Sequence, residues 1–229
     1  MGCSANVYGI DIEIAVDPAH QVIDPAVAPI RRVALSGRDF DELFQGPEAE
    51  LLVDLDHRLA ELPPGVLATW NGSIFDLPFI AERARLIGVD MRLALCLDTR
   101  LTLRRRPLPG HAGAYRAAWG QHRHLDTFRL FGPASTDVSQ SPMARLARRL
   151  GLGGSPSRPA NDLTAEAVHA HAASDARLAR VLTERRWPAA LAMVDELGSS
   201  EPQFVPVAQE RLARRARADA ALTPSVAAI

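Results

Sequence analysis

The sequence predicts an α/β fold in which a mixed sheet is flanked by helices. Strand-like runs alternate with helix-like runs along most of the chain, which is typical of layered sheets and helices. The first two strand-like runs follow each other directly, so they can pair antiparallel. With 229 residues, 47% of them hydrophobic, the chain is long enough for one good-sized core. We therefore expect one domain over residues 1–197, followed by a tail over 198–229.

Hydrophobic patterning predicts the first elements. Residues 7–16 (VYGIDIEIAV) are predicted to form a buried strand, with β-branched residues and with carboxylates at alternate positions, and residues 30–36 a second strand. Segment 47–62 has leucines at helical spacing and acids in its first turn, and Pro63 stops this helix. A short apolar strand is predicted over 66–70.

The middle of the chain continues the alternation. A helix is predicted over 77–87, ending near Gly88, and strand-like runs follow at 91–98 and 123–131. Segment 104–122 between these runs is rich in Arg, Pro and Gly, so we expect it to be a loop or an insertion.

Two further helices are predicted before the tail. The first begins at a Ser-Pro pair and covers 141–150, and a linker-like turn region follows at 151–159. A longer helix covers roughly 164–186. The tail carries an Arg/Ala-rich stretch that predicts one more short helix.

Composition excludes several classes of function. The net charge of −1 neither supports nor excludes a nucleic-acid partner, because a binding groove can be basic locally. All 26 residues counted as Lys or Arg are arginines, which excludes Schiff-base chemistry on lysine and a phosphate loop of the Walker A type.

The cysteines and the hydropathy pattern indicate the expected location. Cys3 and Cys96 lie far apart without CxxC spacing, so neither a zinc cluster nor a disulfide framework is indicated. The chain has no basic segment followed by an apolar one at its start, and no run reaches the ~18 apolar residues of a spanning helix. We expect a soluble cytoplasmic protein with no membrane segment.

Two carboxylates on the first strand are the first candidate site residues. Asp11 and Glu13 are two positions apart, so their side chains leave the same face of the sheet. One of them can pair with an arginine or lie at an exposed edge, the more common outcome for two acids at this spacing. The apolar neighbours Ile10, Ile12 and Ile14 argue instead for a buried central strand, where an uncompensated carboxylate pair is costly and a metal site is favoured.

Two more carboxylates follow in other elements. Asp76 lies in TWNGSIFDLPFI, where a strand leads through a loop into a helix, so it is near the carboxyl end of a strand. Asp175 lies in the predicted helix HAHAASDARLARVL, with His171 four residues before it on the same helical face. His169, six residues before Asp175, points away.

These segments occur in the order of the motifs of DEDD 3′–5′ exonucleases, the ribonuclease H-like superfamily, and the resemblance covers residues 7–186. DIE at 11–13 resembles the first motif. WNGSIFDLPFI at 70–80 resembles the second, especially as found in the proofreading domains of family B DNA polymerases. HAASD at 171–175 resembles the third motif of the tyrosine-type subfamily, Tyr-x-x-x-Asp, with His171 in place of the tyrosine.

The third motif departs from both subfamilies. Histidine-type enzymes place their catalytic histidine five residues before the aspartate, and that position is Ala170 here. LCLDTRL at 95–101 nevertheless resembles a strand that follows the second motif in histidine-type enzymes. We therefore interpret the chain as a tyrosine-type scaffold that carries histidine chemistry.

The resemblance implies a site for two divalent cations, Mg²⁺ or Mn²⁺, which suit oxygen ligands. Asp11 is expected to bridge both ions, Asp175 and Glu13 to complete the first site, and Asp76 to hold the second, directly or through water. His171 is expected to orient or deprotonate the attacking water.

Substrate contacts are expected around the second motif. Asn71 and Phe75 flank Asp76 and are candidates for holding the terminal nucleotide by hydrogen bonding and stacking, together with Ile12 from the first motif. Phe75 can equally be a core residue.

Two other polar groups carry alternative interpretations. Arg104, Arg105 and Arg106, with Tyr115, Arg116 and Trp119, have the composition of a single-strand channel or, equally, of a solvated loop. His122, His124 and Asp126 alternate on one strand face, which permits a metal site, but we favour an edge strand with its polar groups outward.

The expected function is a metal-dependent 3′–5′ exonuclease, a phosphodiester hydrolase that acts at single-stranded or frayed 3′ ends. DNA is favoured over RNA, because the second motif is polymerase-like, and any role in proofreading or DNA repair would be as a separate protein. One alternative is an exoribonuclease that trims RNA or degrades oligonucleotides, distinguished by contacts to the 2′-hydroxyl. Another is a catalytically silent nucleic-acid-binding protein of the same fold.

Overall fold

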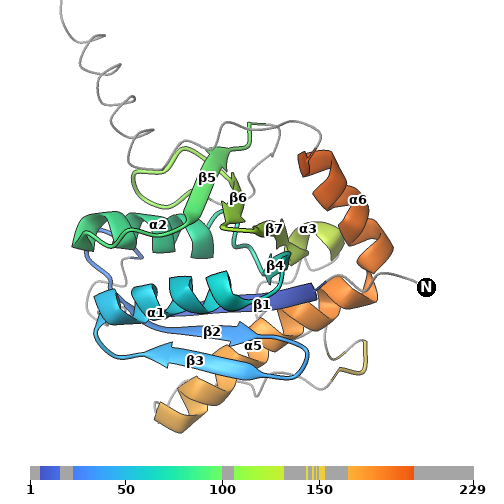
Figure 1. Cartoon of the computed structure of the whole chain (residues 1–229), viewed down its shortest axis with the longest axis horizontal. Coiled ribbons are helices and arrows are strands. Elements are labelled where there is room, and N and C mark those ends of the chain that lie inside the picture. The colour runs from blue at the N-terminus through green and yellow to red at the C-terminus, as the bar shows by residue number, and fades with distance from the viewer. Residues whose placement is uncertain are drawn as a thin grey trace, which may run out of the picture.

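The computed structural model describes residues 6–15, 23–99, 106–131, 150–152 and 165–198, together with Met143, Leu146 and Arg148. In its last segment, side chains are described for 173–194. Figure 1 shows these parts as one sheet with helices packed on it. Among the described helices, none has the length and apolar character needed to cross a lipid bilayer.

The sheet is mixed, as the sequence predicts. Its strand order is β3-β2-β1-β4-β7-β6-β5, with β1 parallel to β4, β4 parallel to β7, and the other neighbours antiparallel. The predicted antiparallel pairing of the first two strands is confirmed. The strands are β1 (Asn6–Ile14), β2 (Ile30–Ser36), β3 (Asp41–Gln45), β4 (Gly65–Thr69), β5 (Leu93–Leu97), β6 (Tyr115–Trp119) and β7 (His122–Asp126).

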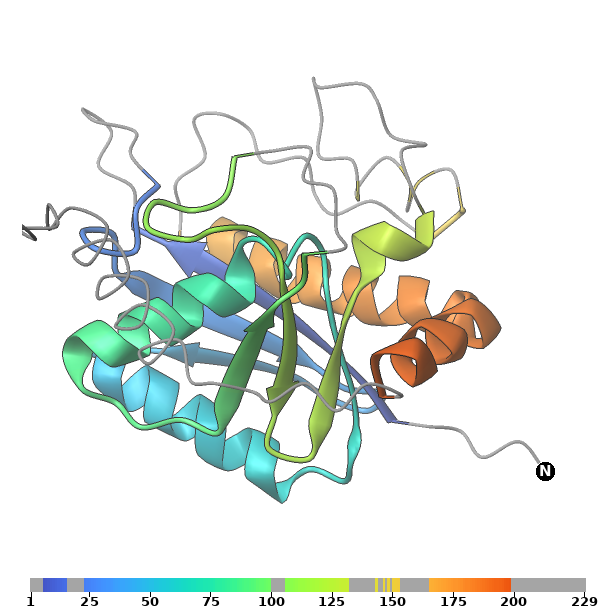
Figure 2. The ribbon, with the colours of Figure 1, turned by 90° about the horizontal axis from the view of Figure 1, so that it is seen from above.

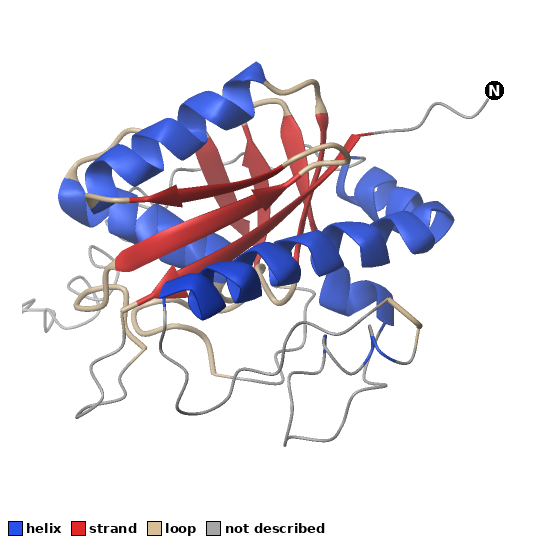
Figure 3. Cartoon of the chain, turned by 90° about the horizontal axis from the view of Figure 1, so that it is seen from below, coloured by secondary structure: helices blue, strands red, loops and turns tan. Residues whose placement is uncertain are grey.

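Helices cover both faces of the sheet, which confirms the α/β class and the expected ribonuclease H-like arrangement (Figures 2 and 3). The first two helices lie on one face and the long α5 on the other. The helices are α1 (Glu48–Glu61), α2 (Asp76–Ile87), α3 (Thr127–Phe131), α5 (Ala165–Arg185) and α6 (Trp187–Gly198).

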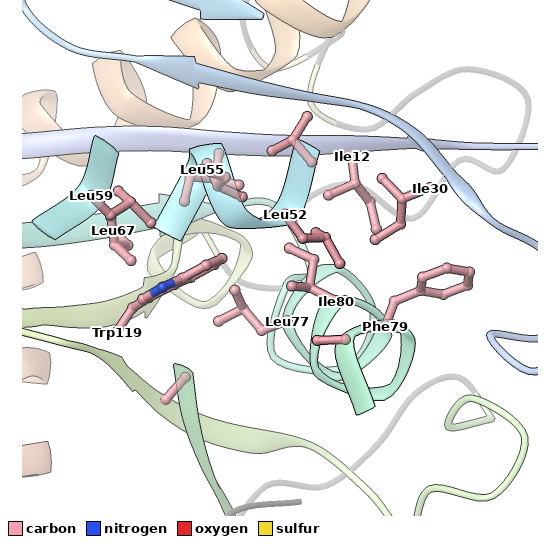
Figure 4. Close-up of a cluster of buried hydrophobic side chains, with 14 of the residues drawn as sticks. Ile12, Ile30, Leu52, Leu55, Leu59, Leu67, Leu77, Phe79, Ile80 and Trp119 are labelled. Carbon is pink, nitrogen blue, oxygen red and sulfur yellow. The ribbon is translucent and has the colours of Figure 1, made fainter. Parts of the chain in front are cut away.

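Side-chain alternation along β1 separates two cores. Tyr8, Ile10 and Ile12 pack with apolar residues of α1 and α2 in the larger cluster, part of which Figure 4 shows. Val7, on the opposite face, packs against α5 in a smaller cluster that contains Leu178. Because β1 has helices on both faces and strands on both edges, it is the central, buried strand that its sequence predicts.

Segment 104–122 is not a loop throughout, so that prediction is wrong for its second half. Residues 106–114 have no regular structure, but Tyr115–Trp119 forms β6 and β7 begins at His122. Alternate residues Tyr115, Ala117 and Trp119 of β6 are buried, which is the pattern of a strand. The arginines and glycines around these residues obscured the alternation.

Other boundaries also differ from the sequence prediction. The predicted strand 123–131 ends at Asp126, and Thr127–Phe131 is helical (α3), because the Asp126 carboxylate caps the helix by accepting the Phe128 N–H. Strand β3 was not predicted, since its apolar residues are only Leu43 and Phe44. The α6 helix was also not predicted.

The remaining predictions fall largely or wholly outside the described residues. In the predicted helix 141–150, Met143, Leu146 and Arg148 are helical and the other residues are not described, apart from a turn at 150. The tail beyond residue 198 and most of the linker 151–159 also lie outside the described part, so the domain boundary stays a prediction.

Candidate active site

The candidate site lies where three parallel strands end. In the register of the sheet, Gly9 of β1 is opposite Ala68 of β4, and Thr69 of β4 is opposite Asp126 of β7. Asp11, two residues after Gly9, is therefore level with the start of the loop that follows β4. Ligands of α/β sheets commonly bind at this carboxyl edge.

The β1 face that carries Asp11 and Glu13 lies under α5. Since Ile10 and Ile12 point into the core beside α1 and α2, the alternating residues of β1 point to the α5 side. Gly9 on that side is in direct contact with α5: a Cβ built on it would be 1.8 Å from the carbonyl oxygen of Ala176. This close approach places Asp175, the residue before Ala176, next to β1.

Asp76 connects the second helix to the central strand. It is the first residue of α2 and is only 3% exposed. Its carboxylate accepts hydrogen bonds from its own backbone N–H and from the backbone N–H of Ile12. Because Ile12 follows Asp11 in β1, its hydrogen bond to the Asp76 carboxylate positions Asp76 beside Asp11.

Burial and neighbouring charges raise the pKa values of two of the four carboxylates. Burial, followed by the negative charges of Asp76, Asp175 and Glu13, raises the pKa of Asp11 well above its ordinary value. Burial also raises the pKa of Asp76 to about 7, with further contributions from the charges of Asp126 and Asp175, against the lowering effect of the two backbone donors. The structure therefore brings the other three predicted acids within electrostatic range of Asp11.

This donor set fits divalent cations in its chemistry. All four ligands would be carboxylate oxygens, which hard cations such as Mg²⁺ and Mn²⁺ prefer. Within the described part of the chain, however, no three His, Cys, Asp or Glu side chains are gathered closely enough to hold a metal ion. Like charges repel, so a shared cation is what would draw these carboxylates onto a common point.

The structure places His171 in α5, one helical turn before Asp175. Its side chain lies outside the described part of the chain, and the role expected for it stays a prediction.

A cavity of about 420 Å³ opens beside Asp11 and Asp76. The three residues expected to contact substrate all line it, with Ile12 buried and Asn71 and Phe75 half-buried. Phe75 also packs on Phe79, with 5.6 Å between ring centroids, so it combines the two alternatives, pocket wall and core. The lining residues are Asp11, Ile12, Ile23, Trp70, Asn71, Ile74, Phe75, Asp76, Arg106, Pro107, Leu108 and Pro109.

Both interpretations of the Arg- and aromatic-rich segment, a single-strand channel and a solvated loop, are wrong for its aromatic residues. Tyr115 and Trp119 are buried, and the Trp119 Nε1–H donates to Asp56 in the core. Arg116 is mostly buried, 3.9 Å from Asp98. Arg106 is exposed and lines the cavity. Arg104 and Arg105 lie outside the described residues.

The outward orientation expected for His122, His124 and Asp126 is also wrong, because β7 lies between β4 and β6 and all three side chains are buried. His122 Nε2 donates to the Leu59 carbonyl (2.7 Å). His124 Nε2 lies 2.8 Å from Thr69 Oγ1, and burial, with the charge of Arg129, lowers its pKa to about 3. These histidines make structural contacts.

Two residues that were not among the expected site residues shape the site. Gly9 allows α5 to approach β1, and Asp126 binds the loop before Asp76. A glycine inside an apolar strand indicates close backbone approach. An aspartate between a strand and a helix indicates an N-cap. The glycine signal is present in the sequence, whereas the N-cap signal at Asp126 is recognisable only once β7 is known to end there.

Comparison with known proteins shows a shared fold. No protein-family model matches the chain, and no curated protein matches it in sequence. Its structure is similar to that of the family B DNA polymerase from the hyperthermophilic archaeon Pyrobaculum calidifontis, with a TM-score of 0.56 and 19% sequence identity. The match covers 80% of this chain and 25% of the polymerase chain. The chain thus has the fold of a portion, about a quarter, of a family B DNA polymerase.

Proposed function

We propose that this protein is a metal-dependent 3′–5′ exonuclease that removes nucleotides from single-stranded or frayed 3′ ends, with DNA favoured over RNA. The observation that carries the proposal is the grouping of Asp11, Glu13, Asp76 and Asp175. Four neighbouring carboxylates at the edge of three parallel strands are unfavourable in their ionised form unless cations compensate their charges. The fold shared with part of a DNA polymerase agrees with this assignment.

Each carboxylate has a distinct proposed role. Asp11, near the other three acids, would ligate both cations, Glu13 and Asp175 would complete the first site, and Asp76 would hold the second. When bound, the two cations supply a water of lowered pKa and charge stabilisation for an in-line phosphoryl transfer. The chain itself would align these ligands. At Asp76, the hydrogen bond from the Ile12 N–H holds the carboxylate in place.

The cavity would bind the terminal nucleotide. Its volume of about 420 Å³ is within the range of small-ligand sites, and its walls are largely apolar next to the carboxylates. Phe75 and Ile12 would contact the base, and Asn71 would hydrogen-bond the nucleotide. A flat ring accepts any base, as a non-selective trimming enzyme requires. Arg106 at the rim adds a positive charge for a backbone phosphate.

A positioned group would assist proton removal from the attacking water. His171 occupies the position one turn before Asp175 and would orient this water or accept its proton.

The decisive experiment incubates the full chain with 5′-labelled single strands of DNA and RNA of the same sequence, with Mn²⁺ or Mg²⁺. A ladder of shortened products that is lost with EDTA and in Asp11→Asn supports the proposal. Faster shortening of the RNA strand would assign the exoribonuclease alternative. Retarded migration without shortening would assign the silent nucleic-acid-binding alternative and refute the exonuclease.

A further inference from the structure

The loop from β4 to α2 is attached to β7 by one buried side chain. The Asp126 carboxylate, 5% exposed, accepts the backbone N–H of Asn71 (2.9 Å) and of Ser73 (3.2 Å). It also accepts the N–H of Phe128 at the start of α3 (3.1 Å) and a hydrogen bond from the Ser73 side chain. One carboxylate thus satisfies donors from a loop 55 residues away in sequence and from its own helix.

Residues of β4 and β6 also hold the same loop by hydrogen bonds. The Gly72 N–H donates to Thr69 Oγ1 (3.1 Å), which lies 2.8 Å from His124 Nε2. The Tyr115 N–H donates to the Ser73 carbonyl (2.8 Å). The loop is therefore tied to β4, β6 and β7, and Asp126 supplies two of its backbone contacts.

The loop contains a residue in the left-handed region of backbone conformation. Among the described residues other than glycine, Asn71 alone has positive φ, at 67°. A left-handed residue persists when its surroundings fix it, and here its N–H is bound by Asp126. The loop ends at Asp76, so a shift at Asn71 or Ser73 moves the first residue of α2.

We propose that Asp126 is a positioning residue of the site, resting on the function proposed above. It is not among the residues that line the cavity. It fixes the loop so that Asn71 lines the cavity and Asp76 stays beside Asp11. Its charge also acts on Asp76, which indicates how near the two carboxylates lie.

Asp56 offers a matched control. It is equally buried, at 5% exposure, and accepts hydrogen bonds from the Arg92 N–H (2.8 Å), the Arg92 Nη1 (2.6 Å) and the Trp119 Nε1–H (2.7 Å). None of these three residues lines the cavity. Replacing Asp56 removes a buried carboxylate and leaves its hydrogen-bond donors without their acceptor, but it removes no contact of the loop.

The test compares Asp126→Ala, Asp126→Asn and Asp56→Ala in the full chain, below the melting temperature of each. Hydrogen exchange at the amides of Asn71 and Ser73 is measured, then Mn²⁺ affinity by calorimetry, then kcat/KM on a single DNA strand. We expect Asp126→Ala to lose protection at both amides, to bind Mn²⁺ at least tenfold more weakly, and to lose on the order of 10²-fold in kcat/KM, the cost of roughly 1 Å of misplacement. Asp56→Ala should lower the melting temperature and leave all three quantities within a few-fold of wild type.

The conservative variant provides rescue. In Asp126→Asn the remaining oxygen can keep the bonds to Asn71 and Phe128, while the new amide faces the Ser73 N–H, so we expect intermediate values. Lost protection with wild-type Mn²⁺ affinity and kcat/KM would overturn the inference and leave the nuclease proposal intact. Equal losses in Asp56→Ala would also overturn the inference, because they would show that the losses come from reduced stability in general. If the wild type does not cleave, the nuclease proposal fails, and exchange and Mn²⁺ affinity still decide the role of Asp126.

Discussion

Gly9 of β1 and Ala176 of α5 approach each other so closely that a Cβ on Gly9 would be 1.8 Å from the Ala176 carbonyl oxygen. The same Cβ would be 2.7 Å from the Ala176 carbonyl carbon and 3.2 Å from the Arg180 Cβ. These neighbours are mostly helix backbone, which cannot rotate away as a flexible side chain can. The distance between α5 and β1, and with it the position of Asp175, therefore depends on residue 9 being a glycine, which has no side chain.

We expect Gly9→Ala to move α5 away from β1. The variant should lose about 1–3 kcal/mol of unfolding free energy, as overpacked cores do, and at least about tenfold in kcat/KM as Asp175 moves from Asp11. Thermal melts and a nuclease assay check both. Gly46→Ala is the control, because Gly46 has no atom within 4 Å of a built Cβ and a φ of 125°, so its variant is strained but should keep wild-type kcat/KM. Wild-type stability and activity in Gly9→Ala would contradict this account.

Asp11→Asn should abolish cleavage and stabilise the protein in EDTA. The substitution removes the ligand proposed for both cations and also removes one of four repelling charges, since the pKa of Asp11 is raised by burial and by Asp76, Asp175 and Glu13. A higher melting temperature in EDTA together with no product ladder is the expected pair of results. More than about a tenth of wild-type activity would exclude Asp11 from the centre of the site.

The stability of the protein in EDTA should fall as the pH rises. The pKa of Asp76 is raised from 3.8 to about 7 in the folded chain, and that of Asp11 is raised in the same direction. A raised carboxyl pKa means that the folded state holds its proton more tightly than the unfolded state. For Asp76, the resulting loss of stability begins above the unfolded pKa, near 4, and continues until the pH passes about 7.

Cations should reverse this dependence. Mn²⁺ binds the ionised carboxylates, so the melting temperature gained on adding millimolar Mn²⁺ should grow between pH 5 and pH 8. Melts in buffers of equal ionic strength, with EDTA or Mn²⁺, measure both trends, and Asp76→Asn should flatten the first. A melting temperature that rises with pH in EDTA, or no response to Mn²⁺ at any pH, would argue against a site for two cations.

Local patterning in the sequence accounts for most of the fold. The helix over α1 was predicted from leucines whose burial the structure confirms, Leu51, Leu52, Leu55 and Leu59. The bounds of β2 agree with its apolar run. Strand β6 was missed because its alternation lies within residues typical of loops. Patterning within a segment was informative, and composition alone was not.

The grouping of the site was predictable only in part. Asp11, Glu13, Asp76 and Asp175 stood out because their three segments occur in the order of the motifs that they resemble, and the structure brings the other three acids near Asp11. The role of Asp126 was not predictable, because its partners are backbone amides of Asn71 and Ser73, more than 50 residues away. Register between β4 and β7 decides that contact, and no local pattern specifies a register between distant strands.

His171 is where the sequence departs from the tyrosine-type motif, so it gives the most specific prediction about the chemistry. An unperturbed imidazole titrates near 6.5 and a phenol near 10, so at neutral pH a histidine can accept a proton that a neutral tyrosine cannot. If His171 is the base, His171→Ala should lose roughly 10²–10⁴-fold in rate, whereas the same change at His57, an exposed residue of α1, should have no effect.

The comparison with His171→Tyr separates orientation from proton transfer. A tyrosine can orient the attacking water, so this variant should recover part of the rate lost in His171→Ala. It should also lose the fall in rate with unit slope that the wild type shows at acidic pH, because the phenol does not titrate there. Ionisation of the attacking water can produce a similar fall in rate in the wild type. The fall is therefore assigned to the imidazole only if the tyrosine variant lacks it. A near-normal rate and an unchanged pH profile in His171→Ala would show that the carboxylates and their cations carry out the reaction without this side chain.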